Sequence, residues 1–125
     1  MKLPKGHQTI MPYLMLKGAL KFLNFTQAVF NAKLTTDMHK LHENGTVMHS
    51  EIVIGGSTIM FTDATEQWKE QTANLFIYVD DADETYKKAL AAGASSLMEL
   101  SDQDYGRTCG VTDPLGNVWW ITSVR

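Results

Sequence analysis

The stretch DPLGNVWWI, residues 113–121, decides how the rest of the chain is interpreted. Its Asp-Pro and Gly-Asn pairs are typical of a tight turn, and the aromatic and β-branched run after them predicts a strand. Neighbouring residues of a strand point to opposite faces of a sheet, so Trp119 and Trp120 meet different surroundings. We predict that Trp119 packs in the core and that Trp120 lies on the opposite face, where it is available to a ligand. The alternative is that both indoles only fill space.

The rest of the chain repeats one order of elements. The first half predicts a strand, a helix and three strands, with turns at Asn44-Gly45 and Gly55-Gly56. The second half predicts the same order, and its helix starts near Asp81 or Asp83 and ends at Gly93. The segments expected in the first half are 10–16, 18–31, 32–41, 46–54 and 57–63, and those in the second are 74–80, 81–93, 94–100, 105–112 and 117–123.

This repeat predicts an α+β fold built from tandem βαβββ modules, at about residues 10–63 and 73–123. A module this short cannot cover both faces of its sheet, so we expect the two to lie side by side as a curved mixed sheet within a single domain, residues 1–125. Helices would cover the convex side, and the concave side would be a cleft. The period of two along each strand assigns to this cleft the side chains of Met11, Tyr13, Met15, Met60, Asn74, Phe76, Tyr78 and Trp120.

The composition excludes several classes of protein. The formal net charge is −3 and the Lys and Arg residues are scattered, which argues against a nucleic-acid partner. Apolar runs are far shorter than the roughly 20 residues of a membrane helix, and the first ten residues lack the apolar core of a signal peptide. We therefore expect a cytoplasmic protein without a membrane partner. The lone Cys109 follows a strand-like pattern and is interpreted as a buried filler.

Four segments together resemble the vicinal oxygen chelate superfamily, which contains glyoxalase I, bleomycin-resistance proteins and extradiol dioxygenases. Within it, they are most similar to the PhnB-like, glyoxalase/bleomycin-resistance-type branch. They are PYLMLKGALKFLNFTQAVFNA (12–32), GTVMHSEIVIGGSTIMF (45–61), VDDADETYKKALAAGA (79–94) and YGRTCGVTDPLGNVWWI (105–121). The resemblance covers nearly the whole chain, and the Asp-Pro-x-Gly-Asn turn before an aromatic strand is its most specific element. It implies the glyoxalase/bleomycin-resistance-type fold.

The resemblance also implies where a metal would bind, because metal-dependent members take one ligand from each of four strands. Those positions fall at Met11, Met60, Asn74 and Trp120 in this sequence. None is a normal ligand of a transition metal, apart from a weak amide oxygen at Asn74. We therefore predict a protein with no metal and no other cofactor.

A few polar residues remain as candidates for chemistry or recognition. His49 and Glu51 are two apart on one strand, so they point the same way and could act as acid and base, or else be a wall histidine and a solvated rim glutamate. Arg107 could hold an anionic group of a ligand. His39, His42 and Glu43 have near-ligand spacing, but we place them on an exposed hairpin.

The resulting hypothesis is a metal-independent, small-molecule-binding protein of unknown ligand, which resembles bleomycin-resistance proteins and is expected to form a homodimer as they do. Its predicted ligand-binding residues are Tyr13, Met15, Met60, Asn74, Phe76, Tyr78, Arg107 and Trp120. The alternative is a glyoxalase-type lyase or dioxygenase-like enzyme, which either binds a metal or uses His49 and Glu51 as catalytic acid and base.

Overall fold

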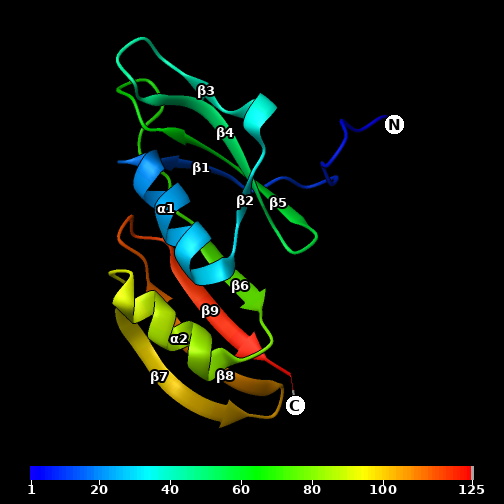
Figure 1. Ribbon diagram of the computed structural model, residues 1–125, viewed down its shortest axis with the longest axis vertical. Coiled ribbons are helices and arrows are strands. Elements are labelled where there is room, and N and C mark those ends of the chain that lie inside the picture. Colours follow the sequence, from blue (N-terminus) through cyan, green and yellow to red (C-terminus); the bar gives the residue numbers. More distant parts are fainter. Residues whose placement is uncertain (125) are drawn as a thin grey trace.

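A computed structural model describes residues 1–124 and shows two modules of the same element order (Figure 1). The predicted α+β class and tandem βαβββ order are confirmed. The first module contains β1 (Tyr13–Leu16), α1 (Ala19–Phe30), β2 (Lys33–Leu34), β3 (Lys40–Leu41), β4 (Val47–Ile54) and β5 (Ser57–Asp63). The second contains β6 (Asn74–Tyr78), α2 (Ala82–Ala91), β7 (Ser95–Gln103), β8 (Gly106–Thr112) and β9 (Val118–Ser123).

One predicted strand, at 32–41, is interrupted. A 3₁₀ turn at Thr36–Met38 separates β2 from β3, and both short strands pair with β4. Thr and Asp side chains offer the backbone local hydrogen-bond partners that compete with a sheet, which favours a turn in this TTDM segment.

Each module forms its own mixed sheet. The strand orders are β1-β5-β4-β2, with β3 also on β4, and β6-β9-β8-β7. In both sheets the first strand pairs in parallel with the last, Tyr13 opposite Met60 and Phe76 opposite Trp120, and the other pairs are antiparallel. An isolated bridge between Met15 and Gln71 joins the first sheet to the segment that leads into the second.

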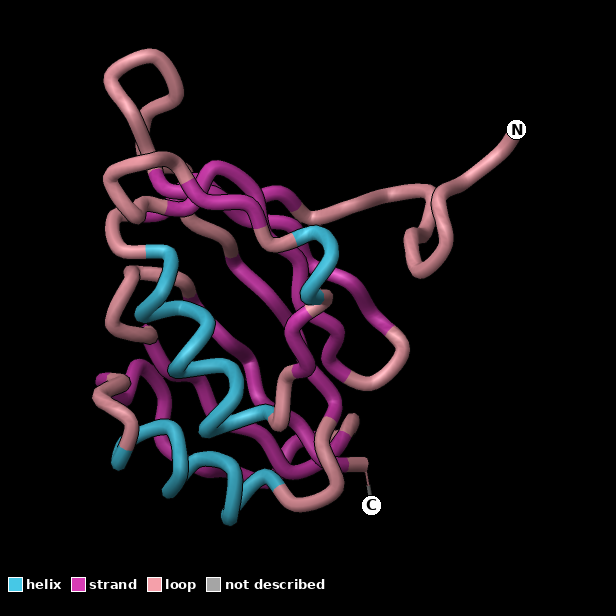
Figure 2. Tube along the Cα trace, turned by 45° about the horizontal axis from the view of Figure 1, so that its top comes forward, coloured by secondary structure: helices cyan, strands magenta, loops and turns pink. Residues whose placement is uncertain are grey.

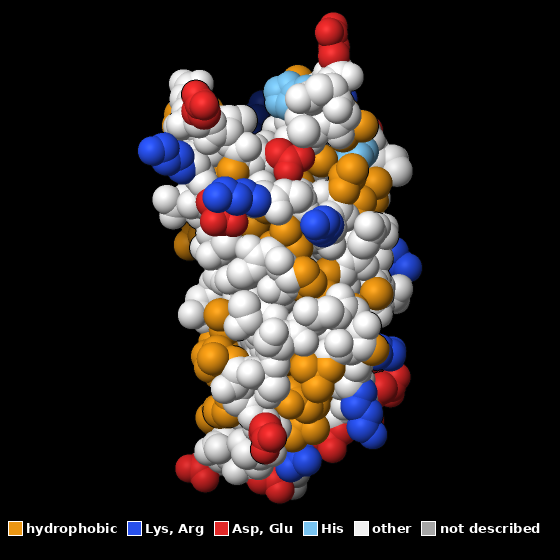
Figure 3. Space-filling view, turned by 90° about the vertical axis from the view of Figure 1, so that its left-hand side faces the viewer, with side chains coloured by type: hydrophobic (Ala, Val, Ile, Leu, Met, Phe, Trp, Pro, Cys, Tyr) orange, Lys and Arg blue, Asp and Glu red, His pale blue; other side chains and the backbone are white. Residues whose placement is uncertain are grey.

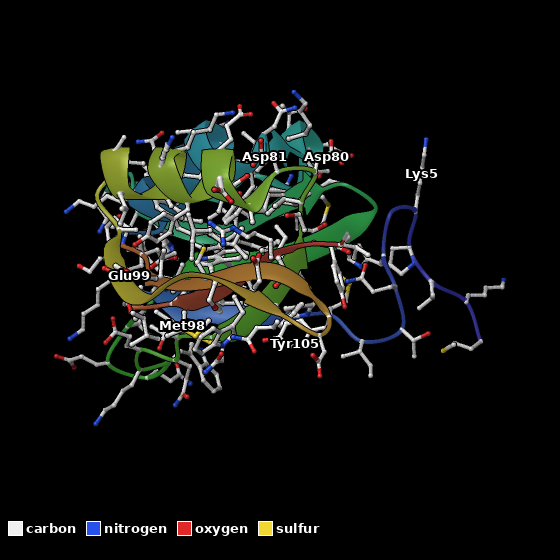
Figure 4. All side chains as sticks on the ribbon, turned by 90° about the horizontal axis from the view of Figure 1, so that it is seen from below. Lys5, Asp80, Asp81, Met98, Glu99 and Tyr105 are labelled. Atoms are coloured by element: carbon white, nitrogen blue, oxygen red, sulfur yellow. The ribbon has the colours of Figure 1, made fainter. Side chains whose placement is uncertain are left out.

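Both helices lie on one side of the sheets, as the view along the long axis shows (Figure 4). Trp119 is 1% exposed and lies on this helix-covered side, with its ring centroid 4.5 Å from Phe30 and 6.3 Å from Phe22 of α1. The prediction that Trp119 is a core residue is confirmed. It packs a helix of the first module against a strand of the second, so the two modules share one hydrophobic core.

The DPLGN turn is fastened from inside by two buried side chains. Gly116 has a φ of 96°, a left-handed conformation that glycine adopts without strain. The carboxylate of Asp113 accepts hydrogen bonds from the backbone of Leu115 and Asn117, and Asn117 in turn accepts one from the backbone of Ala73 before β6. The turn therefore fixes where β9 starts and ties it to β6.

The other expected features can be placed briefly. Neither helix among the described residues is long and apolar enough to cross a membrane. Cys109 is fully buried, and burial raises the pKa of its thiol to about 11, which agrees with its interpretation as a filler. On the face shown in Figure 3, Lys and Arg side chains are interspersed with Asp and Glu.

Candidate functional site

The free face of the first sheet carries a row of predicted site residues. Tyr13, Met60 and Glu51 are register partners across β1, β5 and β4, so their side chains share the face turned away from the helices. Met15 and His49 lie on the same face, and the His49 ring is in edge contact with Tyr13 at 6.1 Å. The side chains of His49 and Glu51 therefore lie on the face that was predicted to form the cleft, since residues two apart on a strand point the same way.

Glu51 is not the solvated rim residue of the alternative interpretation. It is 2% exposed, and its two carboxylate oxygens accept one hydrogen bond each, from His49 Nε2 at 2.9 Å and from His7 Nε2 at 2.8 Å. A buried carboxylate needs such partners because leaving water without them is costly. His7 was not predicted as a site residue, because it lies 44 residues from Glu51 in the sequence and outside every predicted element.

The surroundings of Glu51 shift its titration. Burial raises the pKa of its carboxyl, but hydrogen bonds from His49 and His7, and the charge of those rings when protonated, lower it by more, so the pKa lies below its usual 4.5. A carboxyl whose pKa is lower in the folded than in the unfolded protein stabilises the fold above the unfolded pKa. That stabilisation disappears as the pH falls through the folded pKa.

We therefore expect the free energy of unfolding to decrease as the pH falls below 4.5, and Glu51→Gln to lose this part of the pH dependence. Urea unfolding of both proteins at neutral pH and at several acidic pH values measures the difference. A gap between wild type and variant that stays constant over that range would contradict the assignment.

The free face of the second sheet is aromatic. The rings of Phe76 and Tyr78 of β6 are in edge contact, with their centroids 5.3 Å apart. The ring centroid of Tyr105, in the turn between β7 and β8, lies 6.1 Å from that of Phe76. These three side chains are 49%, 66% and 53% exposed, so the ring surface is open to solvent. Tyr105 and Met98 are seen in Figure 4 on the side of the sheets opposite the helices. Tyr105 was not among the residues predicted from sequence, because it stands at the very start of the predicted strand 105–112 and lies in the turn before β8 in the structure.

Trp120 belongs to this aromatic face, and two neighbours fix its orientation. Its Nε1 donates a hydrogen bond to Asn74 Oδ1 at 2.6 Å. Its ring lies against Gly110 of β8, where an added Cβ would come within 2.5 Å of Cζ3. Gly110 therefore makes room for an indole laid flat on the sheet, a role that the sequence alone did not indicate.

Two hollows border these faces. A groove of about 750 Å³ between the modules is lined by residues that include Ile10, Phe30, Ile59, Phe76 and Tyr78. A second hollow of about 480 Å³ lies over the first sheet, beside Tyr13, Met48, Thr62 and Trp68. The larger one is within the size range of small-molecule sites. The structure thus sorts the predicted site residues into two sets, one on each sheet, with the larger groove touching the aromatic set.

Arg107 is not brought together with the other predicted ligand-binding residues. It alternates with Thr108, which faces Thr122 on the free side, so Arg107 points to the helix side of β8. There its guanidinium donates to both oxygens of Asp83 at 2.9 and 3.2 Å and to Asp102 at 3.3 Å. These hydrogen bonds, first those to Asp83, raise the pKa of the guanidinium above its usual value. Arg107 therefore links β8 to α2, and its guanidinium is already bonded to carboxylates of this chain.

The donor set at the four family metal positions does not fit a metal ion. Met11 and Met60 offer thioethers and Trp120 has no acceptor, while the amide oxygen of Asn74 is already bonded to the Trp120 indole. Over residues 1–124, no group of three or more His, Cys, Asp or Glu residues is arranged to hold a metal. His39 bonds to Ser50 at 2.8 Å, and His42 and Glu43 are exposed on the hairpin where they were expected.

Comparison with known proteins supplies the family. The model of the Glyoxalase/Bleomycin resistance protein/Dioxygenase superfamily matches residues 16–121. The chain is 28% identical over 121 residues to the uncharacterized protein Rv0887c of Mycobacterium tuberculosis, covering 86% of this chain and 69% of the relative.

Solved structures share the fold. A PhnB protein from Bacillus cereus, described as a putative 3-demethylubiquinone-9 3-methyltransferase, superposes with a TM-score of 0.72 at 19% identity, over 94% of this chain and all of the other. TnmS3, an antibiotic binding protein from Streptomyces sp. CB03234, gives a TM-score of 0.71 at 16% identity, over 95% of this chain and 100% of that one. At such identities the likeness concerns the fold, whereas the family model spans most of the sequence. The chain belongs to the Glyoxalase/Bleomycin resistance protein/Dioxygenase superfamily.

Proposed function

We propose that this protein binds a small organic molecule without a metal or other cofactor, in the manner of bleomycin-resistance and PhnB-like proteins. The observation that carries the proposal is the open aromatic face of the second sheet, where Trp120 is held flat by Asn74 and Gly110 beside Phe76 and Tyr78. An antibiotic-binding protein among the structural neighbours supports it.

The chemistry of this face defines the ligand class. Its members, Asn74, Phe76, Tyr78, Met98, Tyr105 and Trp120, carry no charge at neutral pH. Aromatic rings gain by offset stacking and edge contacts with other rings, in addition to the apolar area that they bury. The ligand we propose is therefore a flat, uncharged aromatic compound, with Tyr13, Met15 and Met60 of the first sheet as further contacts.

We also propose that the protein works as a cytoplasmic homodimer of single-domain chains. Large hydrophobic side chains that are at least 46% exposed recur on both sheets, among them Tyr13, Met48, Phe76 and Tyr78. Exposed apolar side chains of this kind, gathered on one face, are typical of interaction sites. A second copy would cover these side chains and turn each open face into a cleft. Sedimentation over a range of protein concentrations would detect the dimer.

Ligand titration followed by tryptophan fluorescence tests the binding proposal. Trp68→Phe removes the signal of the 60%-exposed indole on the 64–73 loop, and Trp119 is buried. In this background we expect acridone, a flat uncharged probe, to quench the remaining emission in a saturable way. Adding Trp120→Ala should weaken binding about five- to tenfold, since the stacking of one ring contributes roughly 1–1.5 kcal/mol. Equal acridone binding with and without Trp120 would exclude this face.

A metal-free proton-transfer enzyme is the second candidate, and the His49–Glu51 contact favours it. The 2.9 Å hydrogen bond from Nε2 leaves the other ring nitrogen of His49 free to act as a base, with Glu51 orienting the ring. His49→Ala should then abolish turnover while leaving ligand binding intact. Stoichiometric Zn, Ni, Mn or Fe in untagged protein would instead support the metal-dependent lyase or dioxygenase interpretation.

A further inference from the structure

We propose that Glu51 is the anchor of a second binding subsite, for nitrogen bases with an N–H donor, and that His7 occupies this subsite in the free protein. The subsite lies on the first sheet and does not depend on the aromatic face. The two carboxylate oxygens of Glu51 have partners of different kinds.

One oxygen has a permanent partner. His49 stands two residues from Glu51 on β4, which is paired with β5 along most of its length. Its hydrogen bond to Oε2 joins two side chains of the same strand, so it does not depend on the position of the N-terminal arm. The anchor thus keeps its position and orientation whatever happens at the other oxygen.

The other oxygen has a removable partner. His7 reaches Oε1 from the N-terminal arm, residues 1–12, whose start extends away from the sheets (Figure 2). Besides the His7 contact, Gln8 donates to the carbonyl of Thr58 at 2.8 Å and accepts from the Thr58 N–H at 3.4 Å, and the Thr58 hydroxyl donates to the carbonyl of Gly6. The end of the arm is fastened by the Met60 N–H, which donates to the carbonyl of Pro12 at 2.9 Å. Residues 1–6 are all exposed. The segment up to Gln8 is held to the sheet mainly by hydrogen bonds of side chains, so it can open locally at a lower cost than global unfolding.

Opening the arm leaves Oε1 of Glu51 without its hydrogen bond from His7. Glu51 is 2% exposed when His7 is in place, so removal of the ring leaves a carboxylate oxygen facing a space of imidazole size. A carboxylate only accepts hydrogen bonds, and donors that carry positive charge bind it most strongly. The register places Met60 opposite Glu51 and Thr58 two residues along β5, so an apolar thioether and a hydroxyl flank the space. These features select imidazoles, amidines and primary amines.

The arm is then an internal competitor. A base that binds Oε1 must displace His7, so its apparent affinity is lowered by the fraction of molecules in which the arm is open. Removing the His7 ring removes the competitor but leaves Glu51 and its hydrogen bond from His49 in place. The proposal therefore predicts that a variant lacking the ring binds free imidazole and that the wild-type protein binds it far more weakly.

The experiment is chemical rescue of His7→Ala by imidazole. We expect the variant to unfold at a lower temperature than wild type and imidazole to restore part of the loss in a saturable way. Furan, which has the same ring size but no N–H donor, should have no such effect. Gln8→Ala is the matched control, because it loosens the arm but leaves His7 free to compete, and its response to imidazole should be much weaker than that of His7→Ala.

Two results would overturn the proposal. One is an unfolding temperature of His7→Ala that does not rise with imidazole beyond the response of wild type. The other is equal rescue in the double variant His7→Ala/Glu51→Gln, whose fold is checked by circular dichroism. If that double variant does not fold, ¹⁵N-labelled His7→Ala decides, since imidazole must then shift the backbone signals around Glu51 and Met60 at a single affinity, and failure to do so refutes the subsite. None of these experiments measures acridone binding, so the proposed aromatic site is tested separately.

Discussion

Replacing Trp119 by alanine should lower the free energy of unfolding by about 3–5 kcal/mol, the usual cost of removing a fully buried large aromatic side chain. The indole is 1% exposed and fills the space between β9 and α1, where it contacts Phe22 and Phe30. Its Nε1 also donates to Asp113 Oδ2 at 2.9 Å, so the substitution leaves a cavity and also takes away a donor from a buried carboxylate. Chemical denaturation followed by far-ultraviolet circular dichroism measures this loss.

The neighbouring indole provides the control. Trp120 lies on the free face and is only partly buried, and its hydrogen bond to Asn74 is exposed to solvent, so Trp120→Ala should cost less, about 1–2 kcal/mol. The two substitutions remove the same atoms from adjacent positions of one strand. Equal losses of stability would show that Trp120 is also a core residue, and would count against a binding face there.

This contrast between Trp119 and Trp120 was predictable from sequence because it depends only on strand alternation. The same holds for the set Asn74, Phe76 and Tyr78, which share a face two residues apart, and for the DPLGN turn. A local pattern of hydrophobicity and turn residues is enough for such features.

Features that depend on contacts between distant segments were not predictable in this way. His7 meets Glu51 across 44 residues, and Asp63 at the end of β5 accepts the backbone N–H groups of Gly18 and Ala19 to start α1. The orientation of Arg107 was not predictable from sequence either. An arginine in a strand could face either side, and only the pairing of β8 with β9 and the position of Asp83 show which one.

The second large effect is expected at Asp113. Its side chain is 4% exposed and accepts four hydrogen bonds: from the backbone of Leu115 and Asn117 on Oδ1, and from the side chains of Asn117 and Trp119 on Oδ2. Asp113→Ala would leave these buried donors without an acceptor, and each such donor costs about 1–3 kcal/mol. Partial relaxation of the turn reduces the sum, so we expect a loss of about 3–5 kcal/mol in the free energy of unfolding.

The same substitution should also disturb the ligand face, because the turn sets the register of β9 against β6 through Asn117 and Ala73. Asp113→Asn retains one acceptor oxygen and turns an N–H₂ group toward the remaining donors, so its loss should fall between those of alanine and wild type. Asp104→Ala, in an exposed turn, should change stability by no more than about 0.5 kcal/mol. If Asp113→Ala were as mild as Asp104→Ala, the four hydrogen bonds of Asp113 would not be what fixes the start of β9.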